Sequence, residues 1–227
     1  EMEIIHHNPR IYTVDNFITP TECRYFQEIS EDYMQRSTVS AINHNTDGKS
    51  DRFEKVGSID KRRTSKNCWV RHDHSDITQS IVKRISELVQ MPKENAESFQ
   101  VLHYGPNEEY QPHLDTFEEG TEIGDAYLEH SGQRLITVIG YLNEVTKGGE
   151  TNFPNIGKKV CPALGRIAVF QDCFEGTNEP NKNALHGASP VISGEKWAFN
   201  LWYRQFQTNL NHIQNQKAAF QLGFYCS

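Results

Sequence analysis

The chain has 227 residues, of which 36% are hydrophobic and 11% aromatic, a composition that suits one large folded domain rather than a disordered chain. Its formal net charge of −7 disfavours a nucleic-acid partner, because a phosphate backbone requires clustered Lys and Arg side chains. No apolar run reaches the length of a transmembrane helix, and no signal peptide is visible, although a leader could have been removed before Glu1.

The cysteines are odd in number and include no C-x-x-C pair, which indicates neither a zinc ribbon nor a disulfide framework. Such a pattern favours a reducing compartment. We therefore expect a soluble protein and favour the cytoplasm, although the sequence does not identify the location. The five cysteines are Cys23, Cys68, Cys161, Cys173 and Cys226.

Two amphipathic helices are predicted in the first part of the chain. The first begins at "TPTEC", where Thr19 is the N-cap, Pro20 lies in the first turn and Glu22 completes a capping box. The second runs from about residue 76 to residue 89, with Pro92 just beyond its end. The apolar stripes of the two helices, predicted to be buried, are Cys23, Phe26, Ile29 and Tyr33, and then Ile77, Ile81, Ile85 and Leu88.

The segment between these helices, "INHNTDGKSDRFEKVGSIDKRRTSK", is polar and charged. A long irregular segment in a compact domain is either a plain loop or a functional lid, and both interpretations remain open here. In the second case, residues 43–63 would close over a substrate at the mouth of the site.

From Ser98 onward, short β-rich runs replace the helical pattern, and "YGPN", "KGGE", "PALG" and "ISGE" separate them as turns. No helix-length periodic run is evident among them, and "EEGTEIGDAYLEHSG" is interpreted as a polar loop at the mouth of the site. This order favours an antiparallel barrel or sandwich over βαβ units. The predicted strands are "SFQVLHY", "EYQPHLD", "RLITVIGYL", "RIAVFQD" and "KWAFNLWYRQF".

The last predicted strand has two different faces. One is uniformly apolar and should pack on a supporting layer, such as the N-terminal helices: Trp197, Phe199, Leu201 and Tyr203. The other is mixed and contains two cations: Lys196, Ala198, Asn200, Trp202 and Arg204. A polar inner face in a barrel is typical of a lumen that binds a ligand.

A candidate metal site begins at "QPHLD". In a strand, His113 and Asp115 would lie on the same face, and an imidazole with a carboxylate is the start of the two-His-one-carboxylate triad of non-haem Fe(II) oxygenases. His186 in "NALHGAS" is a candidate third ligand. Lys196, ten residues later, would suit the distal carboxylate of a bidentate co-substrate, because a buried ammonium requires an anionic partner.

Other interpretations of these residues remain possible. A lone H-x-D is weak evidence, and the pattern could belong to a cupin-like hydrolase or isomerase, or to an inactive binding module that keeps the fold. The remaining histidines singled out here are interpreted as solvated or hydrogen-bonded side chains: His6, His7, His44, His72, His74 and His212.

Three segments, in order, resemble the catalytic domain of the prolyl 4-hydroxylases, in the Fe(II)- and 2-oxoglutarate-dependent dioxygenase superfamily. They are "FQVLHYGPNEEYQPHLD", "QRLITVIGYLNEVTKGGETNFP" and "LHGASPVISGEKWAFNLWYR", and "RRTSK" resembles a further family segment. The resemblance implies a mainly β, double-stranded β-helix (jelly-roll) core packed against N-terminal helices. We expect residues 1–96 to be a helical support and lid within the same globular unit, 97–205 the catalytic domain and 206–227 a C-terminal tail.

The resemblance also implies roles for single residues. The iron ligands would be His113, Asp115 and His186. Lys196 would pair with the distal carboxylate of 2-oxoglutarate, and Tyr104 and Thr151 would donate hydrogen bonds to this co-substrate, unless they only pack within their strands. The implied cofactors are Fe(II), 2-oxoglutarate, O2 and ascorbate, with succinate and CO2 as products.

The substrate side is less well determined. Arg134 matches a basic residue there, although it could equally form a surface salt bridge, and Trp202 could either contact substrate or fill the lumen. Arg204 departs from the family, which often has histidine at this position, and it could bind an acidic part of the substrate. The resemblance implies a proline-containing peptide or protein as substrate. Free proline, another amino acid or a small molecule remain alternatives, a nucleic-acid demethylase is disfavoured, and the oligomeric state is open.

Overall fold

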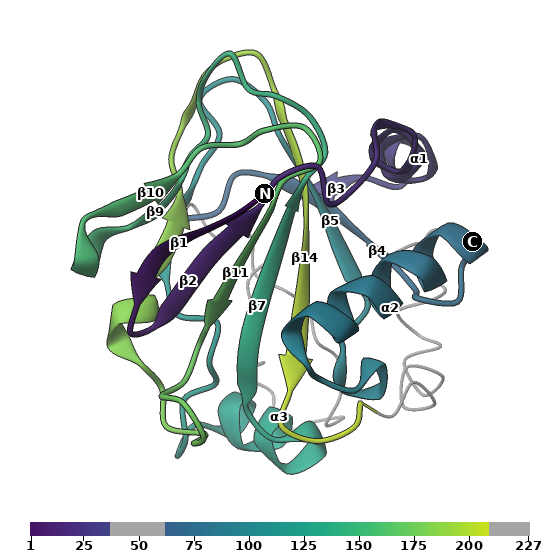
Figure 1. Ribbon diagram of the computed structural model, residues 1–227. Helices are drawn as coiled ribbons and strands as arrows, with labels where there is room; N and C mark the ends of the chain where they lie inside the picture. The colour runs from purple at the N-terminus through teal and green to yellow at the C-terminus, as the bar shows by residue number, and fades with distance from the viewer. Residues whose placement is uncertain (37–61, 209–227) are drawn as a thin grey trace, which may run out of the picture.

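The computed structural model describes residues 1–36 and 62–208, and its largest element is an eight-stranded sheet in which all neighbouring strands are antiparallel (Figure 1). In spatial order the strands are β1 (Met2–His7), β2 (Arg10–Val14), β11 (Ile167–Gln171), β7 (Arg134–Tyr141), β14 (Lys196–Arg204), β5 (Phe99–Tyr104), β4 (Lys66–Val70) and β3 (Gln35–Arg36). The predicted strands in the second half of the chain that join this sheet are confirmed.

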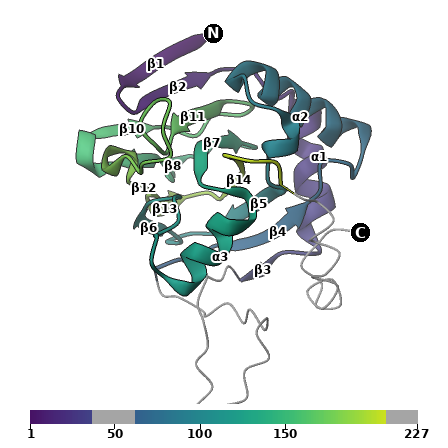
Figure 2. The ribbon, with the colours of Figure 1, turned by 90° about the horizontal axis from the view of Figure 1, so that it is seen from below.

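A smaller antiparallel sheet covers one face of the large sheet, while α1 and α2 cover the other (Figure 2). The predicted jelly-roll core, with helices packed outside it, is therefore confirmed. The small sheet consists of β10 (Lys158–Val160), β9 (Thr151–Phe153), β12 (His186–Ala188) and β6 (Tyr110–His113). A separate pair is formed by β8 (Lys147–Gly148) and β13 (Val191–Ser193), and 3-10 turns lie at Lys93–Asn95, Pro154–Ile156 and Lys182–Ala184.

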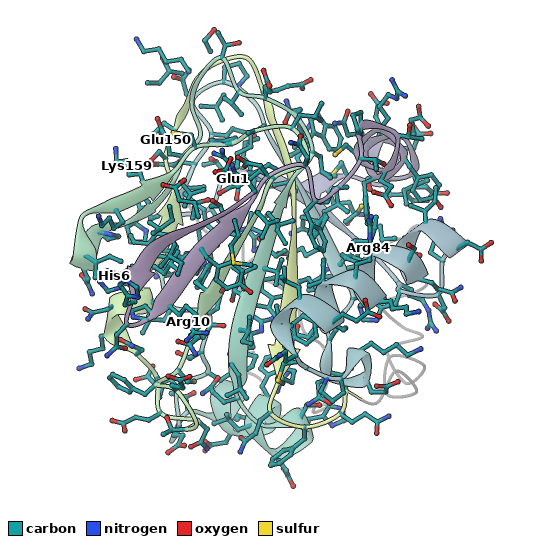
Figure 3. The ribbon with its side chains drawn as sticks, viewed as in Figure 1. Glu1, His6, Arg10, Arg84, Glu150 and Lys159 are labelled. Carbon is teal, nitrogen blue, oxygen red and sulfur yellow. The ribbon has the colours of Figure 1, made fainter. Side chains whose placement is uncertain are left out.

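Helices α1 (Pro20–Glu31) and α2 (Asp76–Val89) begin at capping boxes, those of Thr19 and Ser75. Glu22 has a second role, because one of its carboxylate oxygens accepts a hydrogen bond of 2.8 Å from Arg84 on α2. Figure 3 shows Arg84 on the α2 side of the molecule and Lys159 on the opposite side, near β10. The cap of one helix thus also joins it to the other.

The two faces of β14 divide the protein as the sequence predicts. Phe199 and its neighbours on the apolar face belong to the core under the helices, where Phe26, Phe99 and Phe199 pack with ring centroids 5.0–5.2 Å apart. Lys196, Ala198 and Asn200, on the other face, line a recess between the two sheets. The sheet is therefore the wall between the core and the candidate site.

The N-terminal part of the chain is less helical than expected. Besides the two helices it contributes the hairpin of β1 and β2, and β2 pairs with β11, so residues 2–14 extend the main sheet. The strands β3 and β4 extend it at the other end. Tyr33, expected on the stripe of the first helix, lies beyond the end of α1 and is 37% exposed.

A third helix, α3 (Glu122–Ser131), was not predicted, and the interpretation of "EEGTEIGDAYLEHSG" as a loop is wrong. The hydroxyl of Thr121 caps the helix by accepting a hydrogen bond from the amide of Gly124, and acidic residues occupy its first turn. On this helix Tyr127 stacks on Phe117, with ring centroids 4.6 Å apart. The apolar side is too short to produce a periodic pattern, so local capping and tertiary contacts define this helix.

Several predictions fall outside the described residues. They concern residues 37–61, which include most of the proposed lid, and residues 209–227, which include most of the proposed tail, together with His44, His212 and Cys226. The four cysteines in the described ranges form no disulfide with one another. No helix in the described part of the chain is both long and apolar enough to cross a membrane.

Phe26 should be a major source of stability, since its ring is fully buried between α1 and the sheet. We expect Phe26→Ala to lower the free energy of unfolding in urea by about 3–5 kcal/mol. The matched control is Phe206→Ala, because Phe206 is 59% exposed and its removal should change stability by less than about 0.5 kcal/mol. Equal losses for the two variants would contradict this description of the core.

Candidate metal centre

Two strands of the small sheet bring the imidazoles of His113 and His186 together. In the antiparallel pair β6 and β12, these two residues are direct register partners, and their ring centroids lie 4.6 Å apart. Because side chains alternate along a strand, a register shift of one residue would move one ring to the other face of the sheet. The strand pairing therefore fixes the distance between the two histidines.

Asp115 completes a group of three. It lies just after the end of β6 rather than within the strand, so strand alternation alone does not explain its position. Its Oδ1 is 3.4 Å from Nε2 of His113, and its Oδ2 is 3.5 Å from Nε2 of His186. One ligand atom from each residue lies within 4.8 Å of the others, and this is the one such group found in the ranges 1–36 and 62–208.

The protonation of the two histidines suits a metal ion. Nδ1 of His113 is 2.9 Å from the carbonyl oxygen of Gln111, and Nδ1 of His186 is 3.0 Å from that of Ala184. A carbonyl oxygen only accepts, so Nδ1 of each ring carries a hydrogen, and the neutral form of the ring has its lone pair on Nε2, which faces Asp115. Two lone pairs and a carboxylate converge, and a cation between them would relieve their repulsion. The residues thus fit a divalent metal.

The local pKa values agree with this arrangement. Burial is the main cause that lowers the pKa of His186, to about 4, so its imidazole is neutral near pH 7. Burial alone would raise the pKa of Asp115, but its interactions with the neighbouring imidazoles, first that of His186 and then that of His113, hold it well below its usual range. The site therefore offers two imidazoles and one carboxylate, the donor set of the two-His-one-carboxylate class.

The second oxygen of Asp115 is held by two donors from the large sheet. Oδ2 accepts a hydrogen bond of 2.8 Å from the indole Nε1 of Trp202 on β14, and the hydroxyl oxygen of Thr137 on β7 lies 2.8 Å away. Trp202, expected to contact substrate or to fill the lumen, is thus bonded to a candidate ligand. Thr137 was not anticipated, although a hydroxyl within the apolar run "LITVIGY" was a usable signal.

Lys196 lies in the same recess with little compensation for its charge. It is 3% exposed, and Nζ donates to the carbonyl oxygen of Gly149 over 2.8 Å. The rings of Tyr104 and Tyr141 lie 5.3 and 5.5 Å from Nζ, but the described residues place no ion-pair partner on it. Burial is the largest influence and lowers the pKa of Lys196 to about 7. An anionic ligand is the natural partner of such an ammonium.

The recess connects this ammonium to the histidines. It encloses about 360 Å³, including the part open to solvent, and its lining includes His113, His186, Tyr104, Thr151 and Lys196. The hydroxyl of Thr151 is 2.8 Å from that of a buried tyrosine that the sequence analysis missed, Tyr141. The structure therefore brings the predicted co-substrate residues and the two predicted histidine ligands to one cavity.

Close packing around His113 adds to its fixed position. The ring of Tyr110 stacks on the imidazole with centroids 3.7 Å apart and an interplanar angle of 20°, and the guanidinium of Arg63 lies 4.7 Å from the centre of the tyrosine ring. Gly187 allows β12 to approach β6, because a Cβ atom at this position would lie 2.7 Å from the carbonyl oxygen of Tyr110. Any larger residue there would separate the two strands.

Arg134 and Arg204 are bound to a common carboxylate. Arg134 makes a bidentate ion pair with Glu97, at 2.7 and 2.8 Å, and its guanidinium lies 3.8 Å from the ring centre of Trp202. Arg204 donates to Glu97 and to the carbonyl oxygens of Gly132 and Tyr127. A contact between Arg204 and an acidic substrate would require some of these bonds to exchange.

Comparison with known proteins places this geometry in a defined group. Residues 99–204 match the model of the 2OG-Fe(II) oxygenase superfamily. Prolyl 4-hydroxylase 1 of Arabidopsis thaliana is 33% identical over 223 residues, covering 91% of this chain and 73% of the relative. A putative prolyl 4-hydroxylase of Acanthamoeba polyphaga mimivirus is 30% identical over 195 residues, covering 86% of this chain and 74% of the relative.

Solved structures agree with the fold. The 2OG complex of a viral collagen prolyl hydroxylase from Paramecium bursaria Chlorella virus-1 has a TM-score of 0.63 and 25% identity, and the match covers 86% of this chain and 95% of that one. A Pseudomonas putida prolyl-4-hydroxylase has a TM-score of 0.54 at 16% identity, a likeness of the fold alone.

The three-residue group should bind Co(II), a spectroscopic probe of such sites. Loss of a residue that merely supports a metal ligand costs about 10–100-fold in affinity, so we expect a larger loss for His113→Ala, Asp115→Ala and His186→Ala. Titration followed by visible absorption measures this, and circular dichroism checks that the variants fold. His7→Ala, at an exposed histidine on β1, is the control and should bind like the unaltered protein. Retention of full affinity by any of the three variants would remove that residue from the site.

Proposed function

We propose that this chain, which belongs to the prolyl 4-hydroxylase family of the 2-oxoglutarate- and Fe(II)-dependent oxygenases, hydroxylates prolyl residues in a peptide or protein. Membership of this family makes the chain a dioxygenase that uses Fe(II), 2-oxoglutarate and O2. The observation that carries the residue assignments is one recess lined both by the two histidines of the convergent His-Asp-His group and by a buried ammonium that has no ion-pair partner among the described residues.

We assign the metal to His113, Asp115 and His186, and the distal carboxylate of 2-oxoglutarate to Lys196. When bound, Fe(II) supplies the oxidation in which one oxygen atom of O2 enters a C–H bond of proline and the other enters succinate, as 2-oxoglutarate loses CO2. The charge of Lys196 supports the second assignment, because a dicarboxylic acid has one carboxylate for the metal end of the recess and another for the ammonium.

The chain's own residues would bind and orient the co-substrate. Thr151 and Tyr141, whose hydroxyls lie 2.8 Å apart, are suited to donate hydrogen bonds near the ammonium of Lys196, and Tyr104 forms part of the same wall. The residues around the ammonium are almost wholly buried, and this dry environment strengthens each charge-assisted contact. A neutral Nε2 atom on His186 leaves no proton to be displaced from that ring when metal binds near pH 7.

The relatives support the assignment of a prolyl substrate, because several of them are called prolyl 4-hydroxylases and one is called a collagen prolyl hydroxylase. We assign Trp202 and Arg134 to the substrate side, where the guanidinium stacked on the indole would form part of the floor beneath the peptide. Arg204 would act there through Glu97, which it shares with Arg134.

A substrate panel tests the proposed activity. The protein would be supplied with Fe(II), ascorbate as the proposed reductant, 2-oxoglutarate and either proline-rich peptides or free proline. We expect succinate release together with a mass gain of one oxygen atom on a prolyl residue of a peptide. Efficient hydroxylation of free proline without any peptide product would refute the peptidyl assignment. Omission of ascorbate from the same assay tests its role.

Lys196→Ala should weaken the binding of 2-oxoglutarate far more than the binding of metal. The lost interaction is a charge-assisted hydrogen bond in a buried place, worth about 1.5–3 kcal/mol, or roughly 10- to 150-fold in affinity. Calorimetry with the Co(II)-loaded protein in the absence of O2 measures it, and Co(II) affinity itself should stay within about threefold. Lys147→Ala, at an exposed lysine on β8, is the matched control. Unchanged co-substrate affinity in Lys196→Ala would assign the distal carboxylate to another residue.

The affinity for 2-oxoglutarate should also depend on pH. In the free protein the pKa of Lys196 is about 7, so the ammonium becomes neutral as pH rises above this value, whereas a bound carboxylate would raise the pKa. Binding must then take up a proton, and affinity should fall by up to about tenfold per pH unit above pH 7. The same titration of Lys196→Ala should lack this slope. A wild-type affinity that is flat between pH 7 and pH 9 would contradict the prediction.

A further inference from the structure

A second buried carboxyl group lies one hydroxyl group away from the candidate metal ligand. Asp172 directly follows β11, and its side chain is almost fully enclosed, with 1% of the residue exposed. Its Oδ2 is 2.8 Å from the hydroxyl oxygen of Thr137, and that same oxygen is 2.8 Å from Oδ2 of Asp115. The hydroxyl thus bridges two carboxyl groups, and neither metal binding nor co-substrate binding uses Asp172 directly.

The number of hydrogens limits what this bridge can be. A threonine hydroxyl has one hydrogen to donate, so it satisfies one of the two carboxyl oxygens. With both groups ionised, the other carboxylate oxygen would face the hydroxyl lone pairs at 2.8 Å without a hydrogen between them. A second hydrogen, carried by one of the two carboxyl groups, makes both contacts favourable.

Their surroundings indicate which group carries it. Oδ2 of Asp115 also accepts a hydrogen bond from Trp202, and both carboxylate oxygens face candidate ligand histidines, so the surroundings of Asp115 stabilise its ionised form. Oδ1 of Asp172 is buried and accepts no hydrogen bond within the described residues. A neutral carbonyl oxygen tolerates that environment far better than a carboxylate oxygen.

The charges around Asp172 also favour its protonated form. Burial first, and then the negative charge of Asp115, raise the pKa of Asp172 well above its usual range. Glu97 adds to this increase, while Arg134 and the contact with Thr137 oppose it. Arg134, the cation that would favour ionisation, is already engaged in its bidentate pair with Glu97.

We infer that Asp172 is a protonated positioning residue: its carboxyl group donates to Thr137, and the hydroxyl of Thr137 donates to Oδ2 of Asp115. This relay directs the threonine hydrogen toward the candidate ligand. Asp115 Oδ2 is then held by two donors, and Oδ1 is left as the atom for the metal. The inference rests on the metal site of the proposed function, but not on its prolyl substrate.

Infrared spectroscopy tests the protonation directly. The Co(II)-loaded protein, without O2 or 2-oxoglutarate, would be compared at pH 7 with Asp172→Asn. We expect the difference spectrum to contain the carbonyl stretch of a protonated carboxyl group, which shifts in heavy water. Asparagine lacks this band, but its amide can donate to Thr137 in the same place. Identical spectra for the two proteins in this region would overturn the inference.

Co(II) affinity tests the positioning. Thr137→Val removes the relay without a large change in side-chain volume and should lower the affinity for Co(II) by about 10–100-fold. Asp172→Asn should lose less Co(II) affinity than Asp172→Leu, because asparagine keeps a hydrogen-bond donor for Thr137 and leucine does not. The control is Ser86→Ala, which removes a buried hydroxyl bonded to Tyr203 over 2.9 Å in the core below α2 and should leave Co(II) affinity unchanged.

Two results separate the possible failures. A Thr137→Val protein that binds Co(II) as tightly as the unaltered chain overturns the relay, even if the infrared band is present. The substrate panel, by contrast, can fail while both the band and the affinity loss are observed, and in that case only the proposed substrate is refuted.

Discussion

The most demanding constraint in this protein is a carboxylate held in the interior beside two histidines. An isolated buried carboxylate would cost several kcal/mol, about as much as a small domain has in total stability. The protein offsets this cost around Asp115 with an indole donor from β14, a hydroxyl from β7 and the opportunity to bind a cation. Each donor is attached to a different strand, so the position of the carboxylate depends on the large sheet being assembled.

The sheets also separate two kinds of environment that a dioxygenase needs. On one side of β14, aromatic rings pack under the helices, and on the other a polar recess contains Lys196. The end of this strand lies near α3, and there Arg134 and Arg204 share the partly buried carboxylate of Glu97. Burial alone would raise the pKa of Glu97, but Arg134, and then Arg204, lower it. Arg204 has several acceptors inside the protein, so its guanidinium has a structural use.

Sequence reasoning predicted the features that are written in local patterns. The capping boxes, the alternation in β14 and the spacing of "HLD" and "LHG" led to the helices, to the two faces of the sheet and to the three candidate ligands. It failed where a partner lies far away in the chain. The hairpin of β1 and β2 forms against β11, α3 has little periodicity, and Asp172 is an ordinary residue until Thr137 is placed between it and Asp115. These contacts join residues that are far apart in the chain, so no short stretch of the sequence reveals them.

The pairing of His113 with His186 has a consequence for the order in which the chain folds. The two strands are far apart in sequence, and closing such a long loop is slow compared with forming a helix or a hairpin. Until β6 and β12 meet, the protein has isolated imidazoles but no site that could chelate an ion. A divalent cation would therefore bind the completed topology and find little to bind in a partly folded chain. Its binding free energy then adds to the native state alone and selects against misregistered strands.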